Sequence, residues 1–476
     1  MSRERSALVF PLALMLGGCL VGPDYKPPEG PGVDGYRAAE PPPSESDAAT
    51  AQRIALGERI PAEWWALFHS ARLDETLHQV IAGSYTLSAA KATLAQAREA
   101  IVEARAGLYP QADLDASARR ADAGGTLGTA NLFSVGPTVS YSIDAFGGTR
   151  RRVEEAAALA ENQRFQLAAA YLTLTGNSVT QAITIASTNL QIATVEDLIR
   201  NDQKNLDLVN GAFRAGRAAR SDVLTAEAQL AGDLTQIAPL HQQLSVARHA
   251  LSVLASQAPG RWTPPDFGIE ELTLPGDVPV SLPSELVHQR PDILASEAFL
   301  HADSAAIGVA TAQLYPSITL SASFSQQAGT LAELVEVVGR AWSVGAGLAA
   351  PLYHGGALRA QQRAAVDAYD AQLATYKQTV LSAFGQVADA LSALEHDGEF
   401  VSAASRSVEI AGASLALQRS SYAAGKTSAL QLIVAENVYS NARLVYARAR
   451  GQRLSDTAQL FVALGGGWWD GGERAP

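Results

Sequence analysis

Residues 108–118 read LYPQADLDASA, and residues 314–324 read LYPSITLSASF, so one motif occurs twice, 206 residues apart. Two further pairs of blocks follow these motifs in the same order. They are FGGTRRR (146–152) with HGGALRAQ (354–361), and FRAG (213–216) with YAAG (422–425). Three matched blocks at nearly constant spacing indicate an internal duplication.

Each copy has the same predicted plan. A helical segment precedes LYP, whose proline ends it, and two short strands follow. A very long proline-free helix comes next, then a turn at FRAG or YAAG and a returning helix. The predicted helices are 73–107, 149–213 and 219–257 in the first copy, and 291–313, 357–423 and 427–463 in the second. A helix of roughly 65 residues is about 100 Å long, which indicates coiled-coil-like packing. The helices alone leave open whether they form a tube wall or a solid antiparallel scaffold.

The four predicted strands alternate apolar and polar residues. The apolar residues are Ala112, Leu114, Ala116 and Ala118; Phe133, Val135, Val139, Tyr141 and Ile143; Ile318, Leu320, Ala322 and Phe324; and Trp342, Val344, Ala346, Leu348 and Ala350. Roughly ten residues is the length of a tilted membrane-spanning strand. Four strands are too few to close a barrel, so we expect three chains to supply 12 strands together. The alternative is a soluble four-stranded sheet with one buried face.

The N-terminus carries the pattern of an exported lipoprotein. Arg3 and Arg5 precede an apolar run, and small residues then lead to Cys19, the only cysteine in the chain. We expect residues 1–18 to be a signal peptide and Cys19 to carry an N-palmitoyl and an S-diacylglycerol group, because several acyl chains give stable anchoring. Leu20, in place of Asp, favours the outer membrane. An ordinary signal peptide with a chance cysteine is the alternative.

Composition excludes several classes of protein. The formal net charge of −12 argues against a nucleic-acid partner. The eight histidines are scattered, no phosphate-binding glycine pattern occurs, and no serine has a partnered His and Asp. We therefore predict a protein that is not an enzyme and has no metal or cofactor, apart from the lipid on Cys19.

Several blocks resemble a known family over nearly the whole chain after residue 18. They are CLVGPDYKPP at 19–28, Trp64-Trp65 with Phe68, RPD at 290–292 and LYPS at 314–317. These blocks are similar to those of the TolC/OprM-like outer membrane factors, in the NodT-type lipoprotein branch. The resemblance implies a homotrimer with a 12-stranded transmembrane β-barrel continuous with a long periplasmic α-helical barrel. It also implies outer-membrane lipid, a periplasmic adaptor (membrane fusion) protein and an inner-membrane transporter of the resistance–nodulation–division type as partners.

The resemblance also assigns roles to residues at the two helical turns. The adaptor-contact tips correspond to Phe213, Arg214, Gly216, Tyr422 and Gly425. The residues that close the periplasmic end correspond to Arg220, Asp222, Glu227, Lys426, Gln431 and Glu436. Some members carry acids near the positions of Gln431 and Val434, and this chain does not, so a gate here would rest more on Arg220 and Asp222. Each of these residues can equally be a solvated charge on a helix face.

The chain is therefore expected to divide into six parts. They are a signal peptide (1–18), an acylated Pro- and Gly-rich tether (19–51), a first repeat (52–260), a linker (261–282), a second repeat (283–464) and a tail (465–476). The predicted function is the exit channel of a tripartite efflux system, conducting small molecules passively from an inner-membrane pump. The alternatives are the duct of a type I protein secretion system and a non-conducting structural lipoprotein of the envelope.

Overall fold

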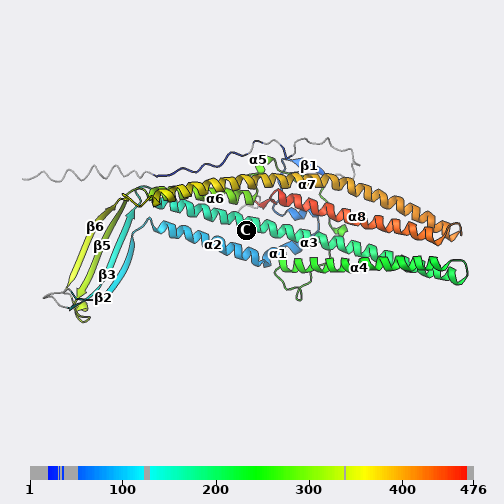
Figure 1. Ribbon diagram of the computed structural model, residues 1–476, viewed down its shortest axis with the longest axis horizontal. Coiled ribbons are helices and arrows are strands. Elements are labelled where there is room, and N and C mark those ends of the chain that lie inside the picture. The colour runs from blue at the N-terminus through cyan, green and yellow to red at the C-terminus, as the bar shows by residue number, and fades with distance from the viewer. Residues whose placement is uncertain are drawn as a thin grey trace, which may run out of the picture. The chain divides into compact units, whose positions relative to one another are not determined.

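The computed structural model describes residues 20–30, 32, 35–36, 52–122, 129–336 and 339–468 (Figure 1). Its helices are α1 (Ala71–Gly83), α2 (Tyr85–Ala106), α3 (Gly148–Arg214), α4 (Arg220–Leu254), α5 (Pro283–Leu286), α6 (Pro291–Ala312), α7 (Ala357–Ala423) and α8 (Ala429–Ala463). Its strands are β1 (Arg53–Leu56), β2 (Gln111–Asp122), β3 (Thr129–Ile143), β4 (Asp277–Val280), β5 (Ser317–Ala328) and β6 (Arg340–Ala349). The fold is mainly helical with a β part, as the sequence predicted.

The internal duplication is visible in the lengths of the elements. Helices α3 and α7 each have 67 residues, α4 and α8 each have 35, and α2 and α6 each have 22. The two long helices confirm the predictions for 149–213 and 357–423. One prediction was wrong: the segment 73–107 is two helices, since extended Ser84 separates α1 from α2 and its Oγ accepts a hydrogen bond from the Leu87 N–H at 3.2 Å. A serine N-cap stabilises a new helix start.

The four long strands form one antiparallel sheet in the order β2-β3-β5-β6. Its register aligns the apolar residues of all four strands on one face, as in the row Ala112–Val139–Ala322–Val344. The opposite face pairs polar side chains across strands, with 2.9 Å between the Oγ atoms of Ser323 and Ser343. Trp342 on β6 is 76% exposed. The predicted alternation is thus confirmed, and large apolar side chains of this face, such as Leu114, Val344 and Leu348, are exposed in the part of the chain that the structure describes.

The chain separates into two compact units, each built from both copies of the repeat. Unit 1 contains 1–29, 92–165 and 294–378, and therefore holds the four-stranded sheet. Unit 2 contains 30–91, 166–293 and 379–476, and holds the helical hairpins α3–α4 and α7–α8 with their turns (Figure 1). The most buried aromatic cluster of unit 2 joins Trp64, Trp65 and Phe68 to Phe461, with ring centroids of Trp64 and Phe461 5.8 Å apart.

Helix α6 is the one described helix that is long and apolar enough to cross a membrane by length and composition alone. Of its most apolar window, 44% is buried within the protein. Ile293 and Leu300 are fully buried, as in a core helix. The burial of these two residues favours a role of α6 in the protein core.

Candidate docking tips and closing region

The two helical turns of unit 2 have the same backbone geometry. Helix α3 ends through hydrogen bonds from the Gly216 N–H to the Phe213 carbonyl (2.9 Å) and from the Arg217 N–H to the Ala212 carbonyl (2.8 Å). Helix α7 ends through the same bonds 209 residues later, from Gly425 and Lys426. The φ of both glycines is 69°, and an added Cβ would meet open space at either one. Glycine is thus required at both tips by the left-handed backbone and not by crowding.

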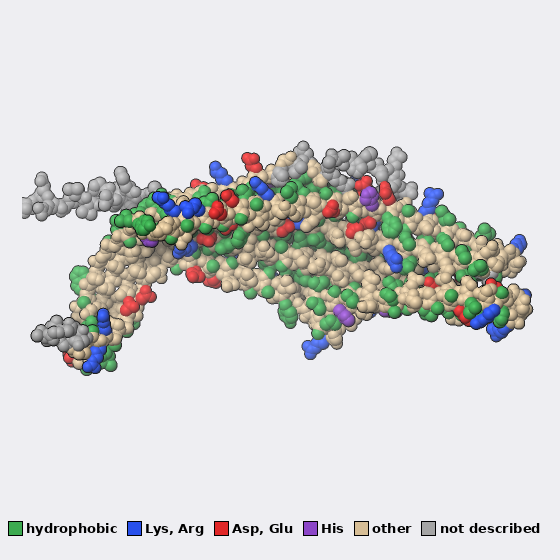
Figure 2. Space-filling view, in the orientation of Figure 1, with side chains coloured by type: hydrophobic (Ala, Val, Ile, Leu, Met, Phe, Trp, Pro, Cys, Tyr) green, Lys and Arg blue, Asp and Glu red, His purple; other side chains and the backbone are tan. Residues whose placement is uncertain are grey.

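The aromatic residues at the two tips differ in exposure. Phe213 is 40% exposed, whereas Tyr422 is half-buried against the cluster of Leu415, Leu432 and Ala435. Arg214 is exposed, and its Nε donates to the Asn210 carbonyl at 3.4 Å. Figure 2 shows charged side chains gathered around these turns. The first tip therefore offers an apolar and a cationic side chain to solvent, while the second keeps its ring partly inside.

Two of the expected closing residues cap the helices that leave the tips. The Asp222 carboxylate accepts a hydrogen bond from the Ala219 N–H at 2.9 Å, at the start of α4. The Gln431 Oε1 accepts from the Ser428 N–H at 3.4 Å, at the start of α8. The two positions are equivalent in the repeat. A side chain at the third helical position that accepts from the cap stabilises the helix start, so these residues have a structural role in the single chain.

Three further expected closing residues lie on the surface. Arg220 and Glu227 form an ion pair with 3.8 Å between Arg220 Nη2 and Glu227 Oε2, and both side chains are about half exposed. Lys426 is exposed directly after Gly425. An exposed pair of this length contributes little to stability, so these charges are available to another chain.

Glu436 is buried in the single chain. It is 5% exposed and lies in the packing of unit 2, where its carboxylate accepts hydrogen bonds from Arg419 Nη2 (3.1 Å) and from Asn205. These bonds join α8 to α7 and α3. Its role in this chain is to hold helices together just above the second tip.

A buried pair of carboxyl groups beside Glu436 was missed by the sequence analysis. Asp202 on α3 and Asp233 on α4 are 3% and 5% exposed. Burial raises the pKa of Asp202 to about 8, and its hydrogen bond to Asp233 and the charges of Asp233 and Glu436 add to the shift. Asp233 accepts hydrogen bonds from Gln229 (2.6 Å) and Gln236 (2.7 Å). At neutral pH, Asp202 is therefore mostly protonated.

Residues 76–256 and 282–466 match the outer membrane efflux protein family. The chain belongs to this family. Nodulation protein T from Rhizobium leguminosarum bv. viciae is 30% identical over 472 residues, which cover 96% of this chain and 92% of the relative. The pyoverdine export outer membrane protein OpmQ from Pseudomonas aeruginosa is 30% identical over 424 residues, covering 85% and 87%. The solved structure of the outer-membrane channel OprN matches with a TM-score of 0.85 at 28% identity, covering 94% of this chain and 100% of that chain.

This membership makes the protein an outer membrane channel of the efflux type, and it confirms the family resemblance and the fold class. Members of the family are channels and not enzymes. The structure also shows what two of the recognisable blocks do in this chain, since each of these two holds distant segments together.

The block that follows Cys19 is held by one buried arginine in unit 1. Arg151, 2% exposed, donates to the carbonyl oxygens of Val21 (3.2 Å) and Gly22 (3.3 Å) and to the Asp24 carboxylate (2.8 Å). Tyr25 stacks on His301 with ring centroids 4.3 Å apart. Cys19 itself lies outside the described residues, so its acylation stays a prediction.

The RPD block performs a similar role in unit 2. The Arg290 guanidinium is buried and binds both oxygens of Asp292 (3.0 and 2.7 Å). It also donates to the carbonyl of Ala463, the last residue of α8 (2.7 Å), and to Gln386 on α7 (2.9 Å). Arg290 thereby links the start of α6 to the end of α8, and it donates a hydrogen bond to the Ala463 carbonyl, which has no partner within the helix.

Three potential metal ligands meet on the surface of unit 2, which the sequence analysis did not expect. Ligand atoms of Glu63, Asp74 and His78 lie within 4.8 Å of one another. The His78 ring is already within 2.9 Å of the Asp74 carbonyl and 3.3 Å of Glu63, and Trp65 Nε1 donates to Asp74 at 3.0 Å. The backbone hydrogen bond to Asp74 raises the pKa of His78. These protein contacts account for the cluster, and we assign no metal to it.

Proposed function

We propose that this protein is the exit channel of a tripartite efflux system, in which three copies form a passive conduit for small molecules. The observation that carries the proposal is the open sheet of unit 1. Its outer strands β2 and β6 have free edges among the described strands, and its apolar face is uncovered. In lipid every backbone polar group needs a partner, so such a sheet requires closure by strands of other copies. Three copies supply 12 strands, within the range of known barrels.

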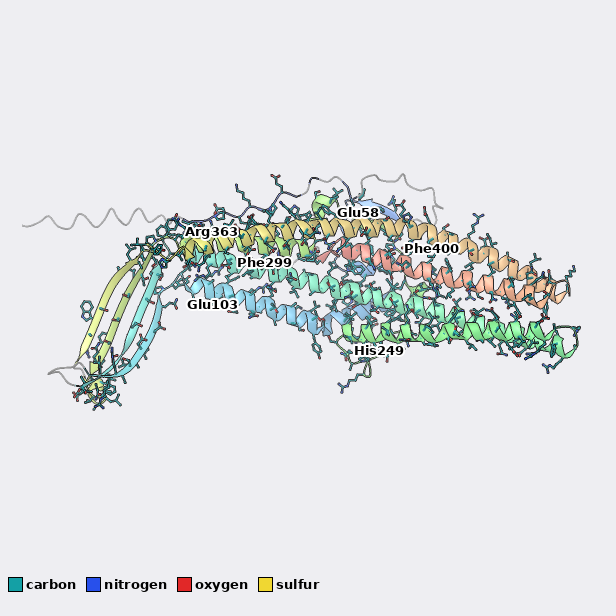
Figure 3. All side chains as sticks on the ribbon, in the orientation of Figure 1. Glu58, Glu103, His249, Phe299, Arg363 and Phe400 are labelled. Atoms are coloured by element: carbon teal, nitrogen blue, oxygen red, sulfur yellow. The ribbon has the colours of Figure 1, made fainter. Side chains whose placement is uncertain are left out.

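The helices support an assembly as well. Helix α7 leaves several large apolar side chains open to solvent in the single chain, and Figure 3 labels one of them, Phe400. They are Leu381, Phe400, Ile410 and Leu417, which are 60%, 46%, 59% and 66% exposed. Apolar side chains recurring along one helix indicate a protein interface. Neighbouring copies that cover α7 would continue the helical wall from chain to chain.

The two tips are proposed as the contacts for a periplasmic adaptor protein, which links the channel to an inner-membrane transporter. The matched turns at Gly216 and Gly425 expose backbone and side chains at equivalent places in the repeat. Six residues near the tips are proposed to close the assembled channel between copies: Arg220, Asp222, Glu227, Lys426, Gln431 and Glu436. Cys19 is proposed to carry the lipid anchor, with Arg151 holding the segment that follows it against unit 1.

The test is growth of a strain that lacks this gene across antibiotics, dyes, detergents and metal salts. We expect the strain to be sensitised to a subset of compounds and rescued by the wild-type gene. A Gly216→Val and Gly425→Val double variant should fail to rescue, because valine is strained at φ 69°. The matched control is Gly232→Val with Gly398→Val, at helical glycines where an added Cβ also meets open space.

Two results would contradict the proposal. Rescue by the tip variant at normal protein levels would show that the tips are not needed for docking to the adaptor and pump. An unchanged sensitivity profile, together with loss of an exported protein from the medium, would favour a type I secretion duct. Cross-linking of the purified protein tests the trimer independently, and a Cys19→Ala variant that still incorporates labelled palmitate would refute the anchor.

A further inference from the structure

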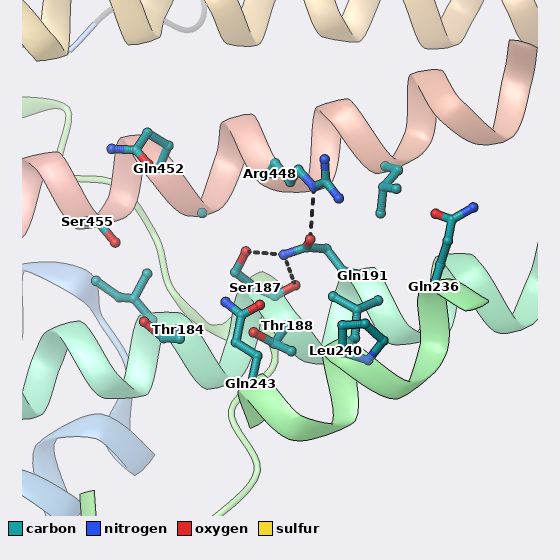
Figure 4. Close-up of a pocket in the computed structure, with 14 residues that line it drawn as sticks. Thr184, Ser187, Thr188, Gln191, Gln236, Leu240, Gln243, Arg448, Gln452 and Ser455 are labelled. Atoms are coloured by element: carbon teal, nitrogen blue, oxygen red, sulfur yellow. Dashed lines mark hydrogen bonds between the residues drawn. The ribbon is translucent and has the colours of Figure 1, made fainter. Parts of the chain in front are cut away.

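An open cavity of about 650 Å³ lies in unit 2 between α3, α4 and α8 (Figure 4). Two residues of the sequence create it. Pro239 lies inside α4 and cannot donate the hydrogen bond that would continue the helix there. Gly451 lets α8 approach α3 closely, since a Cβ at this position would lie 2.3 Å from the Ser187 Oγ. The helices are thus close on one side of the cavity and parted on the other.

Arg448 is the only charged residue among those that line the cavity. Its Nε donates to the Gln191 Oε1 at 3.1 Å, and the Gln191 amide is fixed in turn by Ser187 Oγ at 3.3 Å (Figure 4). Within the described residues, no carboxylate lies within 4.0 Å of the Arg448 guanidinium. The two terminal nitrogens of a guanidinium form a planar fork that matches a carboxylate, and the terminal nitrogens of Arg448 make no hydrogen bond to another described residue.

Other arginines of the same helix are neutralised. Arg443 pairs with Asp197 at 3.2 Å, and Arg450 pairs with Glu270. Arg448 differs from these two neighbours on α8 in having no acidic partner among the described residues. The contrast along one helix indicates that the positive charge of Arg448 is left for something that is not part of this chain.

A buried hydroxyl in the same cavity also lacks a partner. Thr188 is 0% exposed, and its Oγ1 makes no hydrogen bond within the described part of the chain. Three other threonines of this helix each donate a hydrogen bond to the carbonyl four residues earlier: Thr180, Thr184 and Thr194. This is therefore the usual hydrogen bond of a threonine hydroxyl in α3, and Thr188 does not make it. A buried hydroxyl without a hydrogen bond destabilises the fold, and a ligand or water in the cavity would supply the missing partner.

Carboxamides complete the lining. Gln243 on α4 and Gln452 on α8 occupy equivalent positions of the repeat, 209 residues apart, and both line the cavity with Gln236. Each amide offers donors and an acceptor without adding charge. The cavity therefore combines one cation, several neutral polar groups and the apolar side chains of Ile183, Leu240 and Leu444.

We propose that this cavity binds small organic anions that carry a carboxylate on an apolar or hydroxylated body. The carboxylate pairs with the free fork of Arg448, and Thr188 and the glutamines take the remaining polar groups. Binding to this site needs only the chain itself. The further inference that the channel also transports such anions rests on the proposed function.

The test uses the full-length protein purified in detergent and ¹⁹F NMR titration of 4-fluorobenzoate. We expect saturable binding to the wild type and weaker or no binding of the neutral analogue 4-fluorobenzyl alcohol. Arg448→Gln should weaken 4-fluorobenzoate binding at least about tenfold, and Thr188→Val about fivefold. Arg406→Gln, which removes an exposed arginine of α7 outside the cavity, should leave the affinity unchanged.

Three results would overturn the inference. The first is the absence of saturable binding to folded wild-type protein, which would mean that the cavity holds water only. The second is equal affinity of the Arg448→Gln and wild-type proteins for 4-fluorobenzoate. The third is equal binding of 4-fluorobenzoate and 4-fluorobenzyl alcohol. Circular dichroism and elution volume show whether each variant is folded. Because binding is measured without pump or adaptor, a failed growth rescue would contradict the proposed function and leave this inference standing.

Discussion

The buried carboxyl pair of α3 and α4 predicts that helix packing above the tips weakens as the pH rises. Asp202 has a pKa near 3.8 when exposed and about 8 in the folded protein, with burial as the main cause. The neighbouring carboxyl groups of Asp233 on α4 and Glu436 on α8 add to this shift, and Glu436 is paired with Arg419 on α7. A pKa raised by folding means that the stabilisation is fully present below about pH 4 and is lost as the pH rises through about 8.

The magnitude follows from proton linkage. A proton that Asp202 binds in the folded state and releases on opening changes the free energy of opening by at most about 1.4 kcal/mol per pH unit within that window. This corresponds to about a tenfold change in the equilibrium constant for opening. Asp202→Asn keeps the shape and a donor for Asp233 but cannot ionise. We therefore expect the variant to resemble the wild type below about pH 4 and to become increasingly more stable than the wild type as the pH rises from about 5 to 8.

Hydrogen exchange measured by mass spectrometry between pH 5 and 8 can resolve this, once the intrinsic exchange rates are subtracted. Peptides around Asp202 and Asp233 should open more readily with rising pH in the wild type and show a nearly flat profile in Asp202→Asn. Asp207→Asn, at an exposed position of the same helix, is the matched control and should keep the wild-type slope. The reasoning is refuted if Asp202→Asn retains that slope, or if the wild-type packing becomes firmer at high pH.

Three further predictions concern the turns and clamps. Gly425→Ala should lower the free energy of unfolding by about 1 kcal/mol because of its left-handed φ, whereas Gly398→Ala, inside α7, should raise it by about 1 kcal/mol. Thermal or urea unfolding measures both, and equal signs would contradict the tip geometry. Arg290→Met should cost about 1–3 kcal/mol by leaving the buried helix-end carbonyl of Ala463 and the Gln386 side chain without their donor, and a loss below about 0.5 kcal/mol in the same assay would contradict this role of Arg290. Ser428→Ala should cost about 1 kcal/mol and speed hydrogen exchange mainly in the first turn of α8, so a change spread over the whole helix would argue against the cap.

The candidate site shows where sequence reasoning reached its limit. The tips at Gly216 and Gly425 were predictable because a glycine after a long proline-free helix, repeated at a fixed spacing, has a local cause. Glu436 looked like any charged residue near a turn, and only its neighbours on α3 and α7 show that it is buried. Asp202 and Asp233 lie 31 residues apart on antiparallel helices, and no local pattern marks two such acids as a pair.

The sequence by itself determined the duplication, the lengths of α3 and α7, the alternation of the four strands and the family of the protein. These features depend on periodicity, on the absence of proline and on short motifs, all of which are local properties of the chain. The tertiary structure decided which polar side chains are buried together: the Arg151 and Arg290 clamps, the Asp202–Asp233 pair and the cavity around Arg448 and Thr188. Burial and charge pairing depend on which helix faces meet in space, and that information becomes definite only when distant segments pack.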